Sequence, residues 1–414
     1  MTFPSADRAI LRTLAARVSE LAARPGENEK ELLWRKHNAL EATRPLIFCD
    51  PENGWNEIIP SSMLTCEDEL ARQWEFYLRR EIFWGTEMND DRVIRPVFDI
   101  PHVYTETDWG MHETRLGGGH GGAYTWDAPL KDYADIDHLQ FPSITVDWDE
   151  TDRRLELAHE IFDGLLDVRL HTQWWWTLGL TQTFAYLRGL TPMLMDFIAE
   201  PQGLRRLMTF LRDGTLARLD FLEQNGLLSS NTGGEYVGSG GFGWIDSIPL
   251  SGSSAGVVNA EHIRTHDMWG FGEAQETSGV SPTMFAEFIL PCQISVLERF
   301  GLNCYGCCEP LDKRWQYVRT IPRLRRVSVS PWANIPKMAD MLSDDYIFSL
   351  KPSPVPLATS DFDESLIRVE LREKLSHLKN CRVEIIMKDN HTIANDPRRV
   401  TRWVEVARQE SESI

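Results

Sequence analysis

Three of the seven cysteines stand close together in the segment Cys304-Tyr305-Gly306-Cys307-Cys308. In a reducing compartment such a cluster binds a metal or takes part in catalysis more often than it forms disulfides. Cys304 lies on an apolar run, so we expect it in the core. The neighbouring Cys307 and Cys308 cannot both face one cavity if the strand continues through them. We therefore expect Cys307 to be the functional one.

Short apolar runs alternate with helical segments over most of the 414 residues. Eight such runs predict strands, at 44–51, 165–173, 227–231, 266–275, 301–306, 324–332, 345–352 and 381–391. Strands that alternate with helices are typical of a parallel sheet with helical crossovers. Eight such units close most economically into a ring. The sequence therefore predicts the α/β class and a (β/α)₈ TIM barrel.

The barrel is expected to span 44–414, after an N-terminal helical extension at 1–43. Residues 4–43 predict two helices, which separate at Pro25-Gly26. Residues 91–145 are irregular and rich in Gly, Trp, Asp and His, and we expect an inserted excursion with β-hairpin character. Its glycine run 117–122 reads as a plain turn. An insertion of this length usually has a function, such as a lid or a dimer arm.

Polar and aromatic side chains follow most of the predicted strands. In a TIM barrel the chemistry gathers where the strands end and the loops to the helices begin. The candidate site residues are Asp50, Asn53 and Trp55 after the first strand, His171 and Trp174 at the second, Asn231 at the third, Glu273 and Glu276 at the fourth, Tyr305, Cys307 and Glu309 at the fifth, Lys351 at the seventh and His391 at the eighth.

The formal net charge is −19, which argues against a nucleic-acid-binding protein, because such a footprint needs clustered Lys and Arg. No stretch of about 18 apolar residues is present, so we expect no membrane span. The N-terminus reads as an amphipathic helix and lacks the pattern of a signal peptide. These features together predict a cytoplasmic protein.

The stretch 272–315 resembles the uroporphyrinogen decarboxylase superfamily. In that superfamily a polar strand end, a Ser-Pro helix start and a helix that ends near a proline precede a strand with a His-x-Cys motif. The stretch 177–208 resembles its second signature, and 395–408 resembles its C-terminal helix. The resemblance covers roughly 165–410. It implies a barrel that acts as a porphyrinogen decarboxylase, or as a methyltransferase that serves corrinoid proteins or thiols.

The decarboxylase branch fits poorly, since its members carry an Arg-rich segment soon after the first strand, whereas loop 49–60 is acidic and has no Arg. The zinc methyltransferase branch fits better. The resemblance implies Cys307 and His391 as zinc ligands, with Cys308, Glu309 or Glu273 to complete a tetrahedral site. Tyr305 stands where that branch has histidine, so chemistry without a metal stays open.

These residue types suit the chemistry of methyl transfer. Zinc would lower the pKa of a substrate thiol or water and create a nucleophile at neutral pH. Without zinc, Glu273 or Glu276 could act as a general acid if buried. Acidic strand ends and tryptophan walls would suit a cationic methylated amine. The acidic residues are Asp50, Glu52, Glu273 and Glu276, and the tryptophans are Trp55, Trp174, Trp269 and Trp332.

We therefore predict a methyltransferase that moves a methyl group between a small methylated substrate and a corrinoid protein or another acceptor, with zinc and a partner-bound corrinoid as the implied cofactors. Two alternatives remain open. One is a decarboxylase or lyase that acts on a small acid, and the other is a non-catalytic barrel that binds a small molecule. A homodimer that uses the 91–145 insertion is also open.

Overall fold

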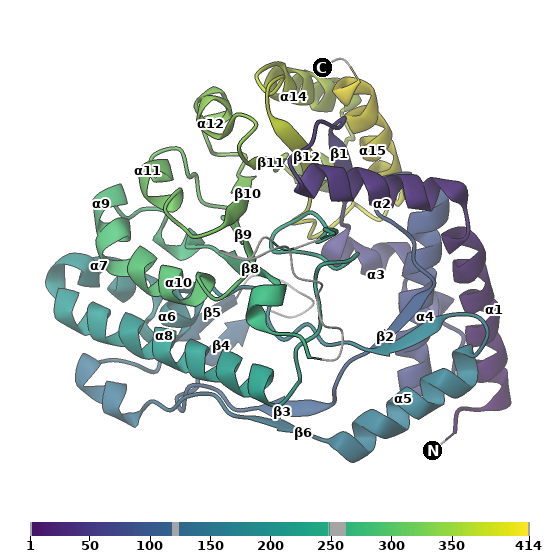
Figure 1. The fold of residues 1–414 in the computed structure, drawn as a ribbon, viewed down its shortest axis with the longest axis horizontal. Helices are drawn as coiled ribbons and strands as arrows, with labels where there is room; N and C mark the ends of the chain where they lie inside the picture. Colours follow the sequence, from purple (N-terminus) through teal and green to yellow (C-terminus); the bar gives the residue numbers. More distant parts are fainter. Residues whose placement is uncertain (1, 118–123, 247, 249–261, 413–414) are drawn as a thin grey trace. The chain divides into compact units, whose positions relative to one another are not determined.

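Strands and amphipathic helices alternate along the chain and form the α/β architecture that the sequence predicts (Figure 1). The computed structural model describes residues 2–117, 124–246, 248 and 262–412. The glycine run that we predicted as a turn therefore lies, apart from Gly117, outside the described residues. Two compact units follow from the contacts. Unit 1 comprises residues 1–103, 147–172 and 350–414, and unit 2 comprises 104–146 and 173–349.

The main sheet is a parallel sheet of six strands in the order β1-β12-β11-β10-β9-β8. The strands are β1 (Leu46–Cys49), β8 (Trp269–Gly272), β9 (Leu302–Tyr305), β10 (Leu324–Val329), β11 (Ile347–Leu350) and β12 (Arg382–Met387). Strands β1, β8, β9 and β11 are buried throughout. Strand β10 is buried in all but its second residue and β12 in all but its first. Burial on both faces explains why their sequences are apolar runs without alternation.

The prediction of a closed eight-stranded barrel is not confirmed, because the sheet is open between β1 and β8 in the described residues. The second predicted strand is present as β7 (Asp167–Leu170), but it pairs in parallel with β2 (Val97–Ile100) in a separate two-stranded sheet. The third prediction, at 227–231, is wrong, since those residues form no strand.

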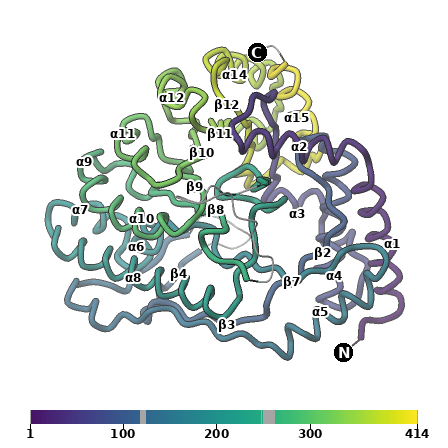
Figure 2. Tube along the Cα trace, in the orientation of Figure 1, coloured from purple at the N-terminus to yellow at the C-terminus, as the bar shows by residue number. Residues whose placement is uncertain are grey.

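Unit 1 contains most of the helices that flank β1 and β12. They are α1 (Ser5–Ala22), α2 (Pro25–Asn38), α3 (Trp55–Ile58), α4 (Glu69–Phe83), α5 (Trp148–Phe162), α13 (Val355–Ala358), α14 (Glu364–Ser376) and α15 (Arg398–Ser411), with the short turns η1 (Glu52–Gly54), η2 (Ser61–Met63) and η3 (Trp84–Met88). Helix α1 buries Leu11, Ala15 and Val18 on one face and packs against α4, and α14 packs against α15 (Figure 2). The two predicted N-terminal helices are thus confirmed, with Pro25 at the first position of the second.

Unit 2 contains α6 (Thr181–Arg188), α7 (Leu190–Ala199), α8 (Pro201–Gln224), α9 (Pro282–Met284), α10 (Leu290–Leu297), α11 (Trp315–Val318) and α12 (Ile335–Leu342), with η5 (Tyr133–His138), η6 (Thr265–Asp267), η7 (Gln275–Thr277) and η8 (Phe285–Ile289). Its excursion carries antiparallel pairs β3 (Tyr104–Glu106) with β6 (Ile144–Val146), and β4 (Thr114–Gly117) with β5 (Tyr124–Asp127). The predicted β-hairpin character of 91–145 is therefore confirmed. No helix among the described residues has the length and apolar character that crossing a bilayer requires.

Side chains take the place of a neighbouring strand at the free edge of β1. The Ile47 N–H donates to Asp91 Oδ2 at 2.7 Å and the Ile47 carbonyl accepts from the Asp91 N–H at 2.8 Å. The Cys49 N–H donates to Asp90 Oδ2 at 3.2 Å. An open edge strand exposes unpaired backbone groups, and these bonds satisfy them.

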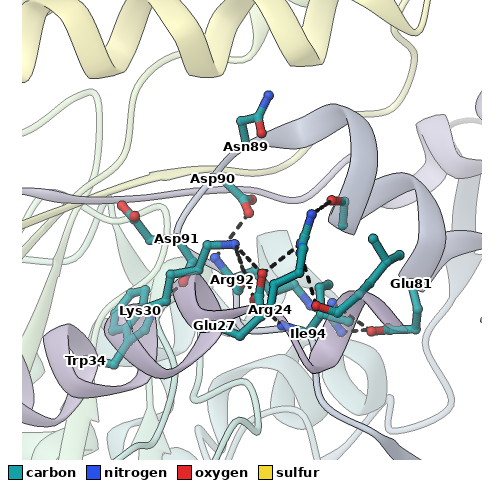
Figure 3. A network of polar contacts seen from close by, with 12 residues as sticks. Arg24, Glu27, Lys30, Trp34, Glu81, Asn89, Asp90, Asp91, Arg92 and Ile94 are labelled. Atoms are coloured by element: carbon teal, nitrogen blue, oxygen red, sulfur yellow. Dashed lines mark hydrogen bonds and ion pairs between the residues drawn. The ribbon is translucent and has the colours of Figure 1, made fainter. Parts of the chain in front are cut away.

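Helix α2 holds this edge-covering loop in place (Figure 3). The Trp34 indole N–H donates to the Asp91 carbonyl at 2.7 Å, and Lys30 Nζ donates to the Arg92 carbonyl at 3.1 Å. Glu27 Oε2 accepts from the Ile94 N–H at 2.8 Å. The N-terminal helices therefore stabilise the edge of β1.

The free edge of β8 is satisfied in the same manner within unit 2. The Trp269 N–H donates to Asn231 Oδ1 at 2.8 Å, and the Trp269 carbonyl accepts from Asn231 Nδ2 at 2.9 Å. Two residues on, the Phe271 carbonyl accepts from the Leu178 N–H at 2.8 Å. The segment that we predicted as the third strand thus contributes one amide side chain to the sheet edge.

Candidate functional site

Three glutamates gather at the carboxyl ends of β8 and β9 in unit 2. Glu273 directly follows β8, Glu276 lies in the η7 turn after it, and Glu309 lies in the loop after β9. Glu273 and Glu309 are fully buried, whereas Glu276 is half-buried. Their charges act on one another, since both neighbours raise the pKa of Glu273. The structure thus brings together three carboxyl groups that the sequence singled out separately.

Glu309 braces the two loops. Its Oε1 accepts from the Ala274 N–H at 2.8 Å and its Oε2 accepts from the Cys307 N–H at 3.0 Å. Each oxygen is therefore bound to the backbone of a different strand end. Burial raises the pKa of Glu309, and the backbone donors oppose that shift. We predicted Glu309 as a metal ligand, and in the structure it positions the loops after β8 and β9.

Glu273 is the most perturbed acid of the cluster. Burial, followed by the charges of Glu276 and Glu309, raises the pKa of Glu273 well above its usual range. Its oxygens accept from Thr177 Oγ1 at 3.3 Å and from the Gln275 N–H at 3.1 Å. Removal of a carboxyl group from water disfavours the charged form. Burial therefore keeps Glu273 protonated to a higher pH than an exposed glutamate.

Close packing by Gly179 encloses Glu273. A Cβ atom on Gly179 would come within 2.5 Å of Glu273 Oε1, a separation that no side chain tolerates. Thr181, two residues later, donates its hydroxyl to Glu276 Oε2 at 2.7 Å. The segment before α6 therefore touches both acids and helps to exclude water from Glu273.

A glutamine on α10 links Tyr305 to the cluster by hydrogen bonds. Its hydroxyl donates to Gln293 Oε1 at 2.7 Å, and Gln293 Nε2 donates to the Glu273 carbonyl at 2.7 Å. Tyr305 and Gln293 are both fully buried. Sequence reasoning missed Gln293, Thr177 and Thr181, and the available signal was that all three lie in the stretches 177–208 and 272–315 that carry the family resemblance.

The adjacent thiols lie on the β9 loop. Cys307 is buried, Cys308 is exposed, and their sulfurs are 3.7 Å apart. Cys304 is fully buried and shares a core cluster with Cys307 and Trp269, so the expected core position of Cys304 is confirmed. In the part of the chain that the structure describes, no three His, Cys, Asp or Glu side chains gather so as to hold a metal ion. Cys307 belongs to unit 2 and His391 to unit 1, so their pairing stays a prediction.

In unit 1 the parallel strands β1 and β12 bring their own strand-end residues together. Asn53 Nδ2 donates to the His391 carbonyl at 2.7 Å, and Asn390 Nδ2 donates to the Asp50 carbonyl at 2.6 Å. Asp50 Oδ1 also accepts from the Trp55 indole at 3.3 Å. The structure therefore brings the candidates Asp50, Asn53, Trp55 and His391 close together, through contacts that join the loops to one another.

Three of the four tryptophans proposed as substrate walls have internal partners, and the fourth, Trp332, is exposed. The Arg80 guanidinium lies 5.0 Å from the ring centre of Trp55, and that of Arg326 lies 4.9 Å from that of Trp269. Trp174 is buried, and its indole donates to the Leu227 carbonyl at 2.7 Å. These three rings therefore pack in the interior.

Two further predicted residues lie at strand ends of unit 1. Lys351 directly follows β11 and is only 4% exposed. His171 directly follows β7 and is half-buried, and its N–H donates to the Ile100 carbonyl at 2.9 Å. Burial and then the charge of His171 lower the pKa of His102.

A pocket of about 310 Å³ opens beside the glutamate cluster, entirely within unit 2. It lies among the loops that follow three neighbouring parallel strands, which is where α/β proteins usually bind their ligands. The lining residues are Ser278, Val280 and Pro282 after β8, Pro310, Asp312, Lys313 and Arg314 after β9, and Trp332, Ala333 and Asn334 after β10.

Arg314 connects the pocket to the loop that carries Glu276. Its guanidinium donates to the carbonyls of Thr277 and Val280, the latter at 3.1 Å, and packs 4.5 Å from the centre of the Phe285 ring. Burial lowers the pKa of Arg314, against the charges of Tyr305 and Glu309. A ligand in the pocket would therefore contact the same loops that position the acids.

No family model and no curated protein matches this chain. Among solved structures, a methyltransferase from Methanosarcina mazei is similar, at 10% sequence identity and a TM-score of 0.49. The match covers 92% of this chain and 97% of that chain. A similarity this low does not assign a function, so the functional argument rests on the residues and geometry above.

Proposed function

We propose that this chain is a methyltransferase, related to the uroporphyrinogen decarboxylase superfamily, that moves a methyl group between a small methylated substrate and a corrinoid protein or another acceptor. The observation that carries the proposal is the buried Glu273, whose pKa is raised, at the end of β8. Glu273 lies within 272–315, the stretch of strongest family resemblance.

Methyl transfer in water lacks a positioned acid that can protonate the departing atom. An acceptor lone pair attacks the methyl carbon while the bond from that carbon to a substrate oxygen, nitrogen or sulfur breaks with its electron pair. The departing atom then needs a proton, which a carboxylic acid can supply. Glu273 holds that proton, and its half-buried neighbour Glu276 is the member of the cluster that a substrate can approach. Glu273 regains a proton from water before the next cycle.

Zinc and the corrinoid enter the proposal from the resemblance. A zinc ion would supply a metal-bound thiolate or water as the nucleophile. The described residues of unit 2 do not by themselves fit such a site, because Glu309 is engaged with two backbone donors and only the two thiols remain beside it. Metal analysis of the purified protein, its Cys307→Ser variant and its His391→Ala variant tests the zinc site directly.

The activity test supplies the protein with a panel of methylated amines, ethers and thiols together with a reduced corrinoid, and follows methylcobalt by its absorbance. We expect turnover with at least one member of the panel. Glu273→Gln should lower kcat by about 10²-fold or more, the range of general acid catalysis. Glu298→Gln, an exposed glutamate of the same unit, is the matched control and should retain full activity.

The pH profile separates a proton donor from a merely structural acid. Since burial raises the pKa of Glu273, its protonated form persists to a higher pH than that of an exposed glutamate, and the rate should fall as the pH rises through that pKa. Glu273→Gln should abolish this limb. If no member of the panel forms or consumes methylcobalt, the methyltransferase proposal fails, and carbon dioxide release from small acids then tests the decarboxylase alternative. Binding without any turnover would instead support the non-catalytic barrel.

A further inference from the structure

The pocket beside the glutamate cluster has a charge opposite to that of the protein as a whole. The chain carries a net charge of −19, yet the lining contains Lys313 and Arg314 against a single acid, Asp312. That acid already has a partner, because Lys337 Nζ lies 3.8 Å from Asp312 Oδ2. The pocket therefore presents a local excess of positive charge in an acidic protein, and such an excess raises the local concentration of anions.

Arg314 is the buried part of this charge. It is only 3% exposed, and each of its hydrogen bonds goes to a neutral oxygen, on Thr277 or Val280. No carboxylate lies within ion-pair distance of it among the residues that the structure describes. A buried cation normally has an anionic partner. A guanidinium that lines a pocket and lacks such a partner is suited to bind an anion from solution.

Lys313 is the exposed part of this charge. It is exposed on the pocket rim, next to Arg314 in sequence. Across the described residues it forms neither a hydrogen bond nor an ion pair, so its ammonium group is available. An exposed ammonium group and a buried guanidinium without an ion-paired carboxylate line one small pocket, and together they favour a ligand with a compact anionic group, such as a carboxylate.

Trp332 indicates the rest of the ligand. It lines the same pocket and is 78% exposed, whereas Trp55, Trp174 and Trp269 are at most 5% exposed. Most other tryptophans are packed against neighbouring side chains, whereas the Trp332 indole is exposed to water and offers a flat apolar surface. A ring that stacks on this surface would recover the contact that Trp332 lacks. The volume of about 310 Å³ lies at the lower end of the range for small-molecule sites and suits one or two rings.

We propose that this pocket binds a planar organic anion, with aromatic carboxylates as the chemical class, whose ring stacks on Trp332 and whose carboxylate lies between Lys313 and Arg314. The inference does not rest on the methyltransferase proposal, because it uses only the charge, burial and shape of the pocket. A ligand held here would lie on the loops that carry Glu276 and Glu309.

Isothermal titration calorimetry with three probes of one shape tests the proposal: 2-naphthoate, neutral 2-naphthamide and cationic 2-naphthylmethylamine. We expect 2-naphthoate to bind most tightly and to weaken as salt rises, because screening reduces the attraction between charges. Lys313→Gln should weaken naphthoate about three-fold, the effect of an exposed charge pair. Trp332→Ala should weaken it about five-fold through the lost stacking.

Both substitutions are at exposed positions, so the fold should survive them, and the unfolding midpoint verifies this. Lys379→Gln and Trp148→Ala replace exposed residues outside the pocket and should leave binding unchanged. Three results would overturn the proposal: equal affinity for the neutral or cationic probe, unchanged naphthoate affinity in both pocket variants, or no measurable heat with naphthoate in the low millimolar range.

Discussion

Replacement of Asn231 by alanine is the sharpest test of how the sheet edge is formed. The Asn231 amide makes two hydrogen bonds to the backbone of Trp269, at 2.8 and 2.9 Å. Trp269 is only 1% exposed, whereas Asn231 is half-buried. Each buried backbone group left without a partner costs about 1–3 kcal/mol. We therefore expect Asn231→Ala to lower the free energy of unfolding by about 2–6 kcal/mol, towards the lower end where water enters beside the smaller side chain.

Urea unfolding, followed by circular dichroism, measures this difference. Asn380→Ala is the control, because Asn380 is exposed and a surface substitution of this kind changes stability by less than about 0.5 kcal/mol. If Asn231→Ala is no more destabilising than the control, the edge of β8 does not depend on the amide, and our explanation of the open sheet is wrong.

Asn231→Asp adds a second test, because its effect on stability should change with pH in a defined direction. The carboxylate can still accept from the Trp269 N–H, but it has no hydrogen for the Trp269 carbonyl until it is protonated. The folded state therefore favours the protonated acid and raises its pKa above the usual value of about 4. The deficit of this variant against the natural protein should be smallest below about pH 4 and should grow as the pH rises. A deficit that does not change with pH would contradict the assigned geometry.

Two other predictions follow from buried carboxyl groups. Gly179→Ala places a methyl group against Glu273, so we expect a loss of about 1–3 kcal/mol in unfolding free energy and a lower methyl-transfer rate. Gly279→Ala is the control, because the space around its Cβ position is open, and it should change neither the stability nor the rate. Burial raises the pKa of Asp90 to about 6, above its value in the unfolded chain, so the natural protein should lose stability as the pH rises from about 4 to 6. Asp90→Asn removes this titration, at a cost in stability that does not depend on pH, because its bonds to the backbone of Cys49 and Arg92 are altered. Between about pH 4 and 6 the unfolding free energy of the variant should therefore rise by up to about 3 kcal/mol relative to that of the natural protein. Urea unfolding at successive pH values measures this difference. Parallel pH profiles of the two proteins would contradict the raised pKa.

Local patterns predicted most of the elements correctly. The apolar runs at 301–306 and 324–332 contain β9 and β10, and the break at Pro25 separates α1 from α2. Such patterns work because most residues of a buried strand are apolar whatever the neighbouring strand in the sheet is. The run 227–231 looked the same, but the pattern contains no information about whether a strand or the single side chain of Asn231 covers the edge of β8.

The candidate site was predicted in part. Glu273, Glu276 and Glu309 were selected because they follow strands, and the structure places them in one cluster. The division of their roles could not be predicted, since Glu309 became a brace only through its bonds to the Ala274 and Cys307 backbone. Gln293 comes from the middle of a helix, where nothing in the local pattern separates it from a surface glutamine.

The sequence by itself determined the α/β class, the positions of most strands and helices, and the polar residues at the strand ends, because these depend on the polarity and turn chemistry of neighbouring residues. Only the tertiary structure decided that the sheet stays open, that burial raises the pKa of Glu273, and that a cationic pocket with an exposed Trp332 lies beside the acids. Desolvation and charge depend on which distant segments pack together, here Gly179 against Glu273 and the loop after β9 against the loop after β8. That packing is a property of the whole fold.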